Sequence, residues 1–429
     1  MPQDIEKIVR AKQDHRRSVP AVAVCDGDAF WSAISPAARW RFLVFATWTI
    51  LLLVVGIRLL NSPGRSVFTT YAGAGHRWLA GMELYTLTGY RGSAFRYSPL
   101  AAAAFVPFNL PSANIGAVAW MICNAGVFLC GIYLWIRRVL PRALSAAEDA
   151  AVWIGVLPLA AMSINNAQIN PFLTGLLLCS TACAASQRWI PAAVFSAGAV
   201  LLKLYPLALP LLLLLVFPRK MIIPLALALL VGLVIPFALQ RPGYVEHQYL
   251  DWLRYLKSDS ERPDEPLFEA YTNFRLLLLA WRVNISDNTF LLSQLVSAAA
   301  IASLCLIARF RGMEQRRLLT MLCSLACCWM ILWGPATESC TYVLIAPALA
   351  WYAIDTWPHP LFSVSRAMIS SAALLLALTI VGGWFHFYTQ LHANGVHPLA
   401  ALLLLLGIVT AEFPAVCRLK ENPSAVPVS

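Results

Sequence analysis

Long apolar runs separated by short polar connections make up most of the chain. The first run, 41–60, is long enough to cross a bilayer as one helix. Several of the later runs are shorter than the ~20 residues of a straight span. The pattern predicts an all-α, polytopic transmembrane helical protein of about 12 spans, within 11–13. The further runs lie near 114–136, 148–163, 170–186, 189–203, 205–217, 221–240, 288–309, 317–334, 338–354, 367–384 and 398–417.

Composition narrows the class of protein. Hydrophobic residues make up 59% of the chain and charged residues 12%, about half the ~25% of soluble domains. A soluble enzyme of this length could not bury so much apolar surface, and a disordered chain needs the opposite composition. We expect one membrane domain, 41–417, between a polar tail, 1–40, and a short tail, 418–429. No signal-peptide pattern precedes the first run, which should therefore act as an uncleaved anchor.

The net charge of +11 predicts an orientation rather than a nucleic-acid partner. Four basic connections, 137–142, 218–220, 309–317 and 418–420, share a side with the N-terminal tail if the short segment 98–110 does not cross. The positive-inside rule then makes both termini cytoplasmic, in a multi-pass protein of the cell (inner) membrane. If 98–110 does cross, 137–142 moves to the other side.

The polar connections that could carry chemistry then share the external, or periplasmic, face. Loops are polar in most proteins, so this clustering alone adds little. Together with the motifs below, it predicts a site at that membrane surface. The connections are 61–97, 164–170, the break at 203–206, 241–287, 333–339 and 385–397.

The first external loop, 61–97, combines aromatic rings, arginines and one isolated carboxylate. The planar guanidinium of Arg96 can donate two parallel hydrogen bonds to phosphate oxygens. Tyr97 has an apolar ring and a polar hydroxyl, which suits the boundary between membrane and water. Glu83 is the only acid between Asp28 and Glu148. The alternative is an aromatic belt with snorkelling arginines.

Four amides follow one another between two apolar runs, at Asn165, Asn166, Gln168 and Asn170. Amides left unpaired at membrane depth are costly, and amides both donate to and accept from sugar hydroxyls. An ordinary Asn/Pro turn that caps two helices explains the same residues equally well.

A lysine interrupts a long apolar stretch at Lys203, in the sequence LLKLYP. Pro206 breaks the helix there, and an intramembrane cation is functional by default, with an anion such as a lipid phosphate as its natural partner. Tyr205 lies beside it. Snorkelling of Lys203 to the surface is the alternative.

Two later connections add further candidates. Asn273 and Arg275 follow the acidic part of loop 241–287, close to the next span. Glu338 is the second isolated carboxylate at the membrane boundary and suits either a helix cap or a general base. The common nucleotide, hydrolase and metal motifs are absent, so we expect no metal and no cofactor.

The ordered motifs resemble glycosyltransferase family 87, of the GT-C superfamily of polytopic membrane glycosyltransferases. They run from about residue 66 to 350, and LKLYP is the most specific. The motifs are TYAGAGHRWLAGMELY, FRYSPLAAAAFVPF, NNAQINPFLTGLLL, AVLLKLYPLALPLLLLL, TNFR and GPATESCTYVLIAPAL.

The resemblance implies transfer of a hexose, mannose in family members that make alpha-1,2 linkages, from a polyprenyl-phosphate donor. The acceptor would be a hydroxyl of a glycan or glycolipid on the external leaflet. The expected mechanism is a single inverting displacement in which a carboxylate takes the acceptor proton. No nucleotide sugar and no obligate metal are implied.

One departure from the family pattern concerns the base. The family often has Asp just before the aromatic residue of the first loop, where this chain has Val67 before Phe68. Glu83 matches an acidic position of a later family element. The histidines that the family often has near the tenth span are missing here, and Glu338 occupies that neighbourhood. Either acts as base, with Glu83 slightly preferred, or this member is altered in activity. A transporter or flippase of a lipid-linked substrate is the other alternative.

Overall fold

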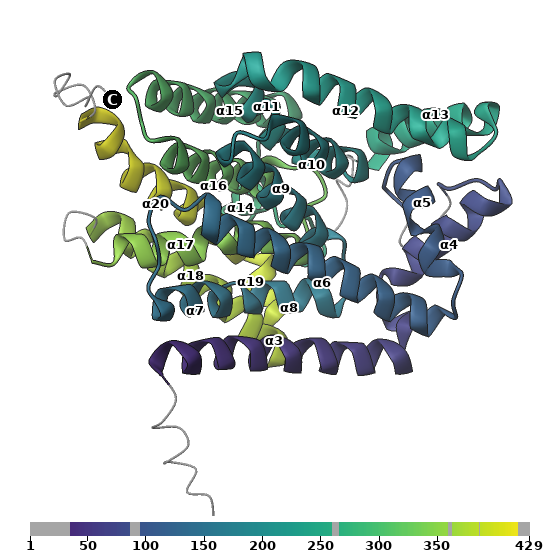
Figure 1. Cartoon of the computed structure of the whole chain (residues 1–429), viewed down its shortest axis with the longest axis horizontal. Helices are drawn as coiled ribbons and strands as arrows, with labels where there is room; N and C mark the ends of the chain where they lie inside the picture. The colour runs from purple at the N-terminus through teal and green to yellow at the C-terminus, as the bar shows by residue number, and fades with distance from the viewer. Residues whose placement is uncertain (1–34, 86–94, 260–265, 359–362, 386, 419–429) are drawn as a thin grey trace, which may run out of the picture.

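The computed structural model describes residues 35–85, 95–259, 266–358, 363–385 and 387–418, and every regular element in them is helical. Most of both predicted tails lies outside these residues. In chain order (Figure 1), the elements are α3 (Pro36–Asn61), η1 (Pro63–Arg65), α4 (Phe68–Ala80), α5 (Pro99–Phe105), η3 (Val106–Asn109), α6 (Ala113–Arg138), α7 (Ala146–Gly155), α8 (Leu157–Asn165), α9 (Asn170–Ala185), α10 (Trp189–Leu202), η4 (Tyr205–Leu207), α11 (Ala208–Val216), α12 (Pro218–Leu239), α13 (Pro242–Asp259), α14 (Phe274–Ala280), α15 (Asp287–Phe310), α16 (Gln315–Trp333), η5 (Ser339–Ile345), α17 (Ala346–Thr356), α18 (Ser363–Trp384), α19 (Tyr388–Ala393) and α20 (Val396–Arg418).

The predicted all-α, polytopic class is confirmed, whereas the predicted count of 12 spans is not. In the described residues, eight helical stretches are long and apolar enough to cross a membrane: Pro36–Asn61, Ala113–Arg138, Ala146–Asn165, Pro218–Leu239, Asp287–Phe310, Gln315–Trp333, Ser363–Gly383 and Val396–Cys417. Four of the predicted runs form shorter elements instead. Prolines account for two of them, since Pro206 follows the end of α10 and Pro347 begins the 11-residue α17.

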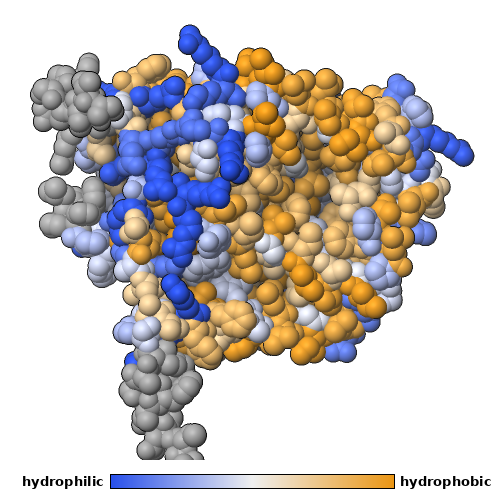
Figure 2. Space-filling model, in the orientation of Figure 1, coloured by the Kyte–Doolittle hydropathy of each residue, from blue (hydrophilic) through white to orange (hydrophobic). Residues whose placement is uncertain are grey.

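The polar connections gather at two opposite ends of the bundle. At one end, Arg316 donates to the backbone carbonyls of Arg137 and Arg138, at 3.0 Å each, and Arg311 donates to that of Val416 at 2.9 Å. We call this the basic end; it comprises 137–145, 186–188, 217–220, 309–317 and the last turn of α20. Figure 2 shows a band of hydrophilic residues on the left of this face, with further hydrophilic groups at its right edge and a largely apolar surface between them.

The opposite end, which we call the site end, joins the connections 62–85, 95–98, 165–170, 203–206, 266–273 and 334–345. The start of α3 and the end of α20 lie on the same side of the molecule, on the left in Figure 1, whereas α4, α5 and α13 lie on the right. The segment 98–110 forms α5 and η3, a length of about 18 Å, which is less than the ~30 Å hydrocarbon core. Asn109 ties it to α4 by donating to the carbonyl of Ala72 at 2.6 Å.

Burial separates the central helices from the peripheral ones. Helix α16 is 83% buried along its apolar window, whereas α12 and α15 are 17% and 11% buried. In a membrane, α12 and α15 therefore present most of their side chains to lipid. Helices α6 and α9 approach closely through glycines: a Cβ added to Gly131 would lie 2.7 Å from the Cα of Gly175.

Candidate functional site

A chain of hydrogen bonds crosses the centre of the site end. A carboxylate oxygen of Glu338 accepts from the side-chain Nε2 of Gln168 at 3.2 Å. The side-chain Oε1 of Gln168 accepts from the Tyr71 hydroxyl at 3.3 Å. The Tyr71 hydroxyl lies 3.0 Å from that of Tyr97. Four segments are thereby joined: α4, the residues just before α5, the turn 165–170 between α8 and α9, which we call the amide turn, and the start of η5. We call Tyr71, Tyr97, Gln168 and Glu338 the tyrosine–amide relay.

The amide turn is held rigidly between α8 and α9. Ala167 has a left-handed backbone (φ 53°), which costs roughly 1 kcal/mol for a residue with a side chain. Its backbone carbonyl accepts from the Trp120 indole at 2.9 Å. The backbone carbonyl of Gln168 accepts from the Asn124 side-chain amide at 2.7 Å. Ala336, two residues before Glu338, is also left-handed (φ 50°). A residue with a strained backbone thus lies within two positions of each partner of the Gln168–Glu338 contact, and such strain is frequent at functional sites.

Lys203 reaches the same cluster from the break between α10 and η4. Helix α10 ends at Leu202, and Lys203 itself is extended and half-buried. Its ammonium lies 4.8 Å from the ring centre of Tyr205 and 5.9 Å from that of Tyr97. The Tyr205 hydroxyl donates to Asn170 at 3.1 Å, which connects Lys203's neighbour to the amide turn. The predicted lysine, tyrosines and amides are therefore brought together.

Glu338 combines the two roles that the sequence left open. Its side chain caps η5 in a reciprocal capping box with Thr341, whose hydroxyl accepts from the Glu338 N–H at 3.2 Å. Glu338 is nevertheless solvent-exposed, and its other contact is the Gln168 amide. A carboxylate that is oriented by its neighbours and still accessible has the geometry of a general base.

The phenols of the relay are held in their neutral form. Burial, reinforced by the charge of Glu338, raises the pKa of Tyr97 to about 12. Burial likewise raises the pKa of Tyr71 well above its usual value. Both hydroxyls therefore keep their protons at neutral pH and can donate hydrogen bonds.

Glu83 lies apart from the relay. It is exposed, in the stretch after α4 that docks on α13, where Leu84 donates its N–H to Gln248 at 2.9 Å and Tyr244 donates to the carbonyl of Met82 at 2.7 Å. Within the described part of the chain, Glu83 makes no hydrogen bond or ion pair. The contacts of the site end therefore favour Glu338 over Glu83, the reverse of the order expected from the sequence.

The family model of glycosyltransferase family 87 matches residues 95–335, which is more than half of the chain. The chain belongs to glycosyltransferase family 87. This match confirms the expected family, and with the apolar helices it confirms the expected class of membrane glycosyltransferase.

This family 87 protein is similar to the solved structure of ArnT from Cupriavidus metallidurans in the apo state, at 15% identity and a TM-score of 0.44, over 89% of this chain and 78% of that one. No match was found among curated proteins.

Three of the remaining predicted residues serve mainly local structure in this family 87 protein. Asn273 caps α14 by accepting from the N–H of Arg275 at 3.1 Å. Arg275 pairs with Asp287 at 2.5 Å on the surface. The Asn165 side chain accepts from Arg58 at 2.5 Å. No hydrogen bond or ion pair joins these three to the relay in the residues that the structure describes.

Arg96 lies closer to the relay. Its guanidinium is 5.8 Å from the ring centre of Tyr271, and its carbonyl accepts from the Trp252 indole at 3.2 Å. Its positive charge lowers the pKa of Tyr97, the residue that follows it, against the larger effect of burial. Arg96 is therefore a second cation beside Tyr97, in addition to Lys203.

The position where the family often has Asp also belongs to the site end. The backbone N–H of Val67 donates to the carbonyl of Asn166 at 3.2 Å. A carboxylate at position 67 would therefore stand beside the amide turn that holds Gln168. In the described residues, Glu338 is the carboxylate that hydrogen-bonds Gln168.

Sequence reasoning missed two residues of this end. Tyr71 is the hub of the relay, and its hydroxyl also accepts from the N–H of Ile169 at 3.3 Å. The second is Arg58, an arginine in the last turn of an apolar span, which was itself a signal of a functional or bracing role. Among the described residues, no group of three His, Cys, Asp or Glu could hold a metal ion.

Proposed function

We propose that this protein transfers a hexose, mannose by family resemblance, from a polyprenyl-phosphate donor to an acceptor hydroxyl of a glycan or glycolipid, with inversion. The observation that carries the proposal is the relay, which connects an exposed carboxylate, Glu338, to a tyrosine that lies under the ammonium of Lys203. A base and a phosphate-binding cation are the two groups that this reaction needs from the protein.

In the proposed mechanism, Glu338 takes the proton of the acceptor hydroxyl. The acceptor oxygen then forms a bond to the anomeric carbon as the bond from that carbon to the phosphate oxygen breaks. The leaving polyprenyl phosphate carries the electron pair, and Lys203 and Arg96 stabilise its charge. Gln168 orients Glu338, and the neighbouring amides, Asn166 and Asn170, with Tyr205 hydrogen-bond the sugar.

The site end would face the periplasm, with both termini in the cytoplasm and the membrane domain 41–417 in the inner membrane. The basic end supports this orientation, because cationic connections are enriched on the cytoplasmic side. Donor and acceptor would both be lipid-bound or surface-bound at the outer leaflet.

The test is glycan transfer by the purified full-length protein supplied with labelled lipid-phosphate sugar. We expect Glu338→Gln to lower kcat by about 10²–10⁴, the usual contribution of a general base, while the matched control Glu83→Gln leaves it within a factor of about three. Full activity in Glu338→Gln would overturn Glu338 as the base. Movement of intact donor across the bilayer without product would indicate a flippase instead.

A second candidate function is a family member without transfer activity. The presence of Val67, where the family often has Asp, favours it. If the native protein shows no transfer and Val67→Asp starts it, this candidate replaces the proposed function. If the native protein is active, Val67→Asp in the Glu338→Gln background tests whether position 67 can supply the base.

A further inference from the structure

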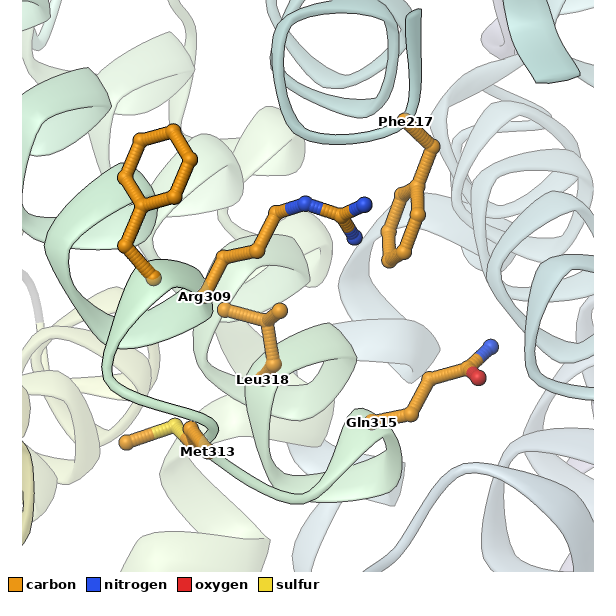
Figure 3. A pocket seen from close by; sticks show the side chains of 6 residues that line it. Phe217, Arg309, Met313, Gln315 and Leu318 are labelled. Carbon is orange, nitrogen blue, oxygen red and sulfur yellow. The ribbon is translucent and has the colours of Figure 1, made fainter. Parts of the chain in front are cut away.

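A cavity of about 390 Å³ opens at the basic end, far from the tyrosine–amide relay. It lies between the start of α12 and the turn from α15 to α16, and Arg309 crosses its centre (Figure 3). The lining residues are Phe217, Arg309, Phe310, Met313, Gln315 and Leu318.

Arg309 has no acidic partner in this cavity. Its guanidinium points toward Phe217 and lies 4.6 Å from the centre of that ring, a cation–π contact (Figure 3). No Asp or Glu oxygen of the described residues lies within ion-pair distance of it. The nearest acid along the chain, Glu314, is exposed and forms no ion pair among those residues either. Within the described residues, the charge of Arg309 is therefore not balanced by a carboxylate in the cavity.

A second cation is fixed beside the first. The ring of Phe217 lies 4.9 Å from that of Trp189, and the ammonium of Lys220 stands 5.3 Å from the centre of the Trp189 ring. Lys220 also donates to Gln187 at 2.6 Å, and Gln187 donates to Gln315 of the cavity wall at 2.6 Å. Arg309 thus contacts the ring of Phe217, and Lys220 contacts the ring of Trp189. The amide of Gln187 links Lys220 to Gln315 of the cavity wall.

The surroundings of the cavity are apolar and face lipid. Its lining residues come from the residue before α12, the end of α15, the following turn and the start of α16, and α12 and α15 are the two least buried spans. Phe310, in the wall, is 81% exposed, and Ile223 in the second turn of α12 is 66% exposed. In a membrane these side chains contact acyl chains, while Arg309 and Lys220 lie at the level of the headgroups.

We propose that this cavity binds the headgroup phosphate of an anionic phospholipid. The phosphate diester would lie between Arg309 and Lys220, the amides of Gln187 and Gln315 would hydrogen-bond its oxygens, and the acyl chains would follow α12 and α15. Basic pockets between spans are known to take such headgroups, and a planar guanidinium matches phosphate oxygens. This site is separate from the donor site at Lys203.

The test is native mass spectrometry of the full-length protein in detergent, titrated with phosphatidylglycerol, phosphatidylcholine or inorganic phosphate. We expect preferential binding of phosphatidylglycerol, reduced about fivefold in Arg309→Gln and about 25-fold in Arg309→Gln/Lys220→Gln. The control Arg138→Gln removes the same charge from an exposed position of the basic end outside the cavity, and should bind as the native protein does.

Folding is checked by thermal unfolding in lipid-free detergent, and Arg309→Lys, which keeps the charge, should retain more binding than Arg309→Gln. Equal loss in Arg138→Gln would show only a diffuse charge effect and overturn the proposal. Equal binding of phosphatidylcholine, or competition by inorganic phosphate at millimolar concentration, would also overturn it. Sugar transfer should be unchanged in Arg309→Gln, which separates this site from the proposed catalytic one.

Discussion

Tyr97 is the residue at which the two halves of the candidate site meet. Its hydroxyl belongs to the relay that ends at Glu338, and its ring lies under the ammonium of Lys203. The Tyr85 hydroxyl donates to the Tyr97 carbonyl at 2.9 Å, so the first loop holds it in place on the other side. The site is thus built on side chains that are already oriented before any substrate arrives.

Lys203 gives the sharpest prediction at this scale. Replacing it with Gln should lower kcat/KM for the lipid-phosphate donor by about 10²–10³, because one preorganised group no longer stabilises the leaving phosphate. Lys203→Arg keeps the charge and should lose less. Steady-state kinetics with labelled donor measure both variants, and a Lys203→Gln enzyme with native kcat/KM would contradict a role in phosphate binding.

Residue chemistry was partly predictable from the sequence. Lys203 and the amides stood out because polar groups within apolar runs must find partners, and the structure does place them together. The contact on which we base the proposal of Glu338 over Glu83 was not predictable. It joins Gln168 to a residue 170 positions later, and only packing brings such residues together.

At the scale of elements, the apolar runs predicted where helices lie but not how long they are. The run 338–354 divides into η5 and the short α17, because Glu338 and Thr341 cap a 3-10 turn and Pro347 starts the helix. The run 148–163 divides at Val156 into α7 and α8, with Pro158 in the first turn of α8. Hydropathy reports burial and lipid contact, and does not report such local breaks.

The α6–α9 contact yields a prediction about stability. A Cβ on Gly175 would meet the backbone carbonyl of Val127, so Gly175→Leu must push α9 away from α6. Because α9 begins at Asn170 of the amide turn, we expect both a lower thermal unfolding temperature and reduced transfer. Gly126→Leu, on the same helix pair but with open space around its Cβ, is the matched control and should unfold as the native protein does.

The whole molecule has one polar site end and one basic end, and this asymmetry predicts its orientation. Arginines of four connections gather at the basic end, so it should stay in the cytoplasm and the relay should face outward. Cysteines introduced at Glu83 and Arg138, both exposed and at opposite ends, test this. With a membrane-impermeant maleimide and native protein as the background control, Glu83→Cys should react in intact spheroplasts, and Arg138→Cys only after lysis. The reverse pattern would place the relay in the cytoplasm, where a periplasmic acceptor cannot reach Glu338, and the proposed reaction would then need a cytoplasmic donor and acceptor.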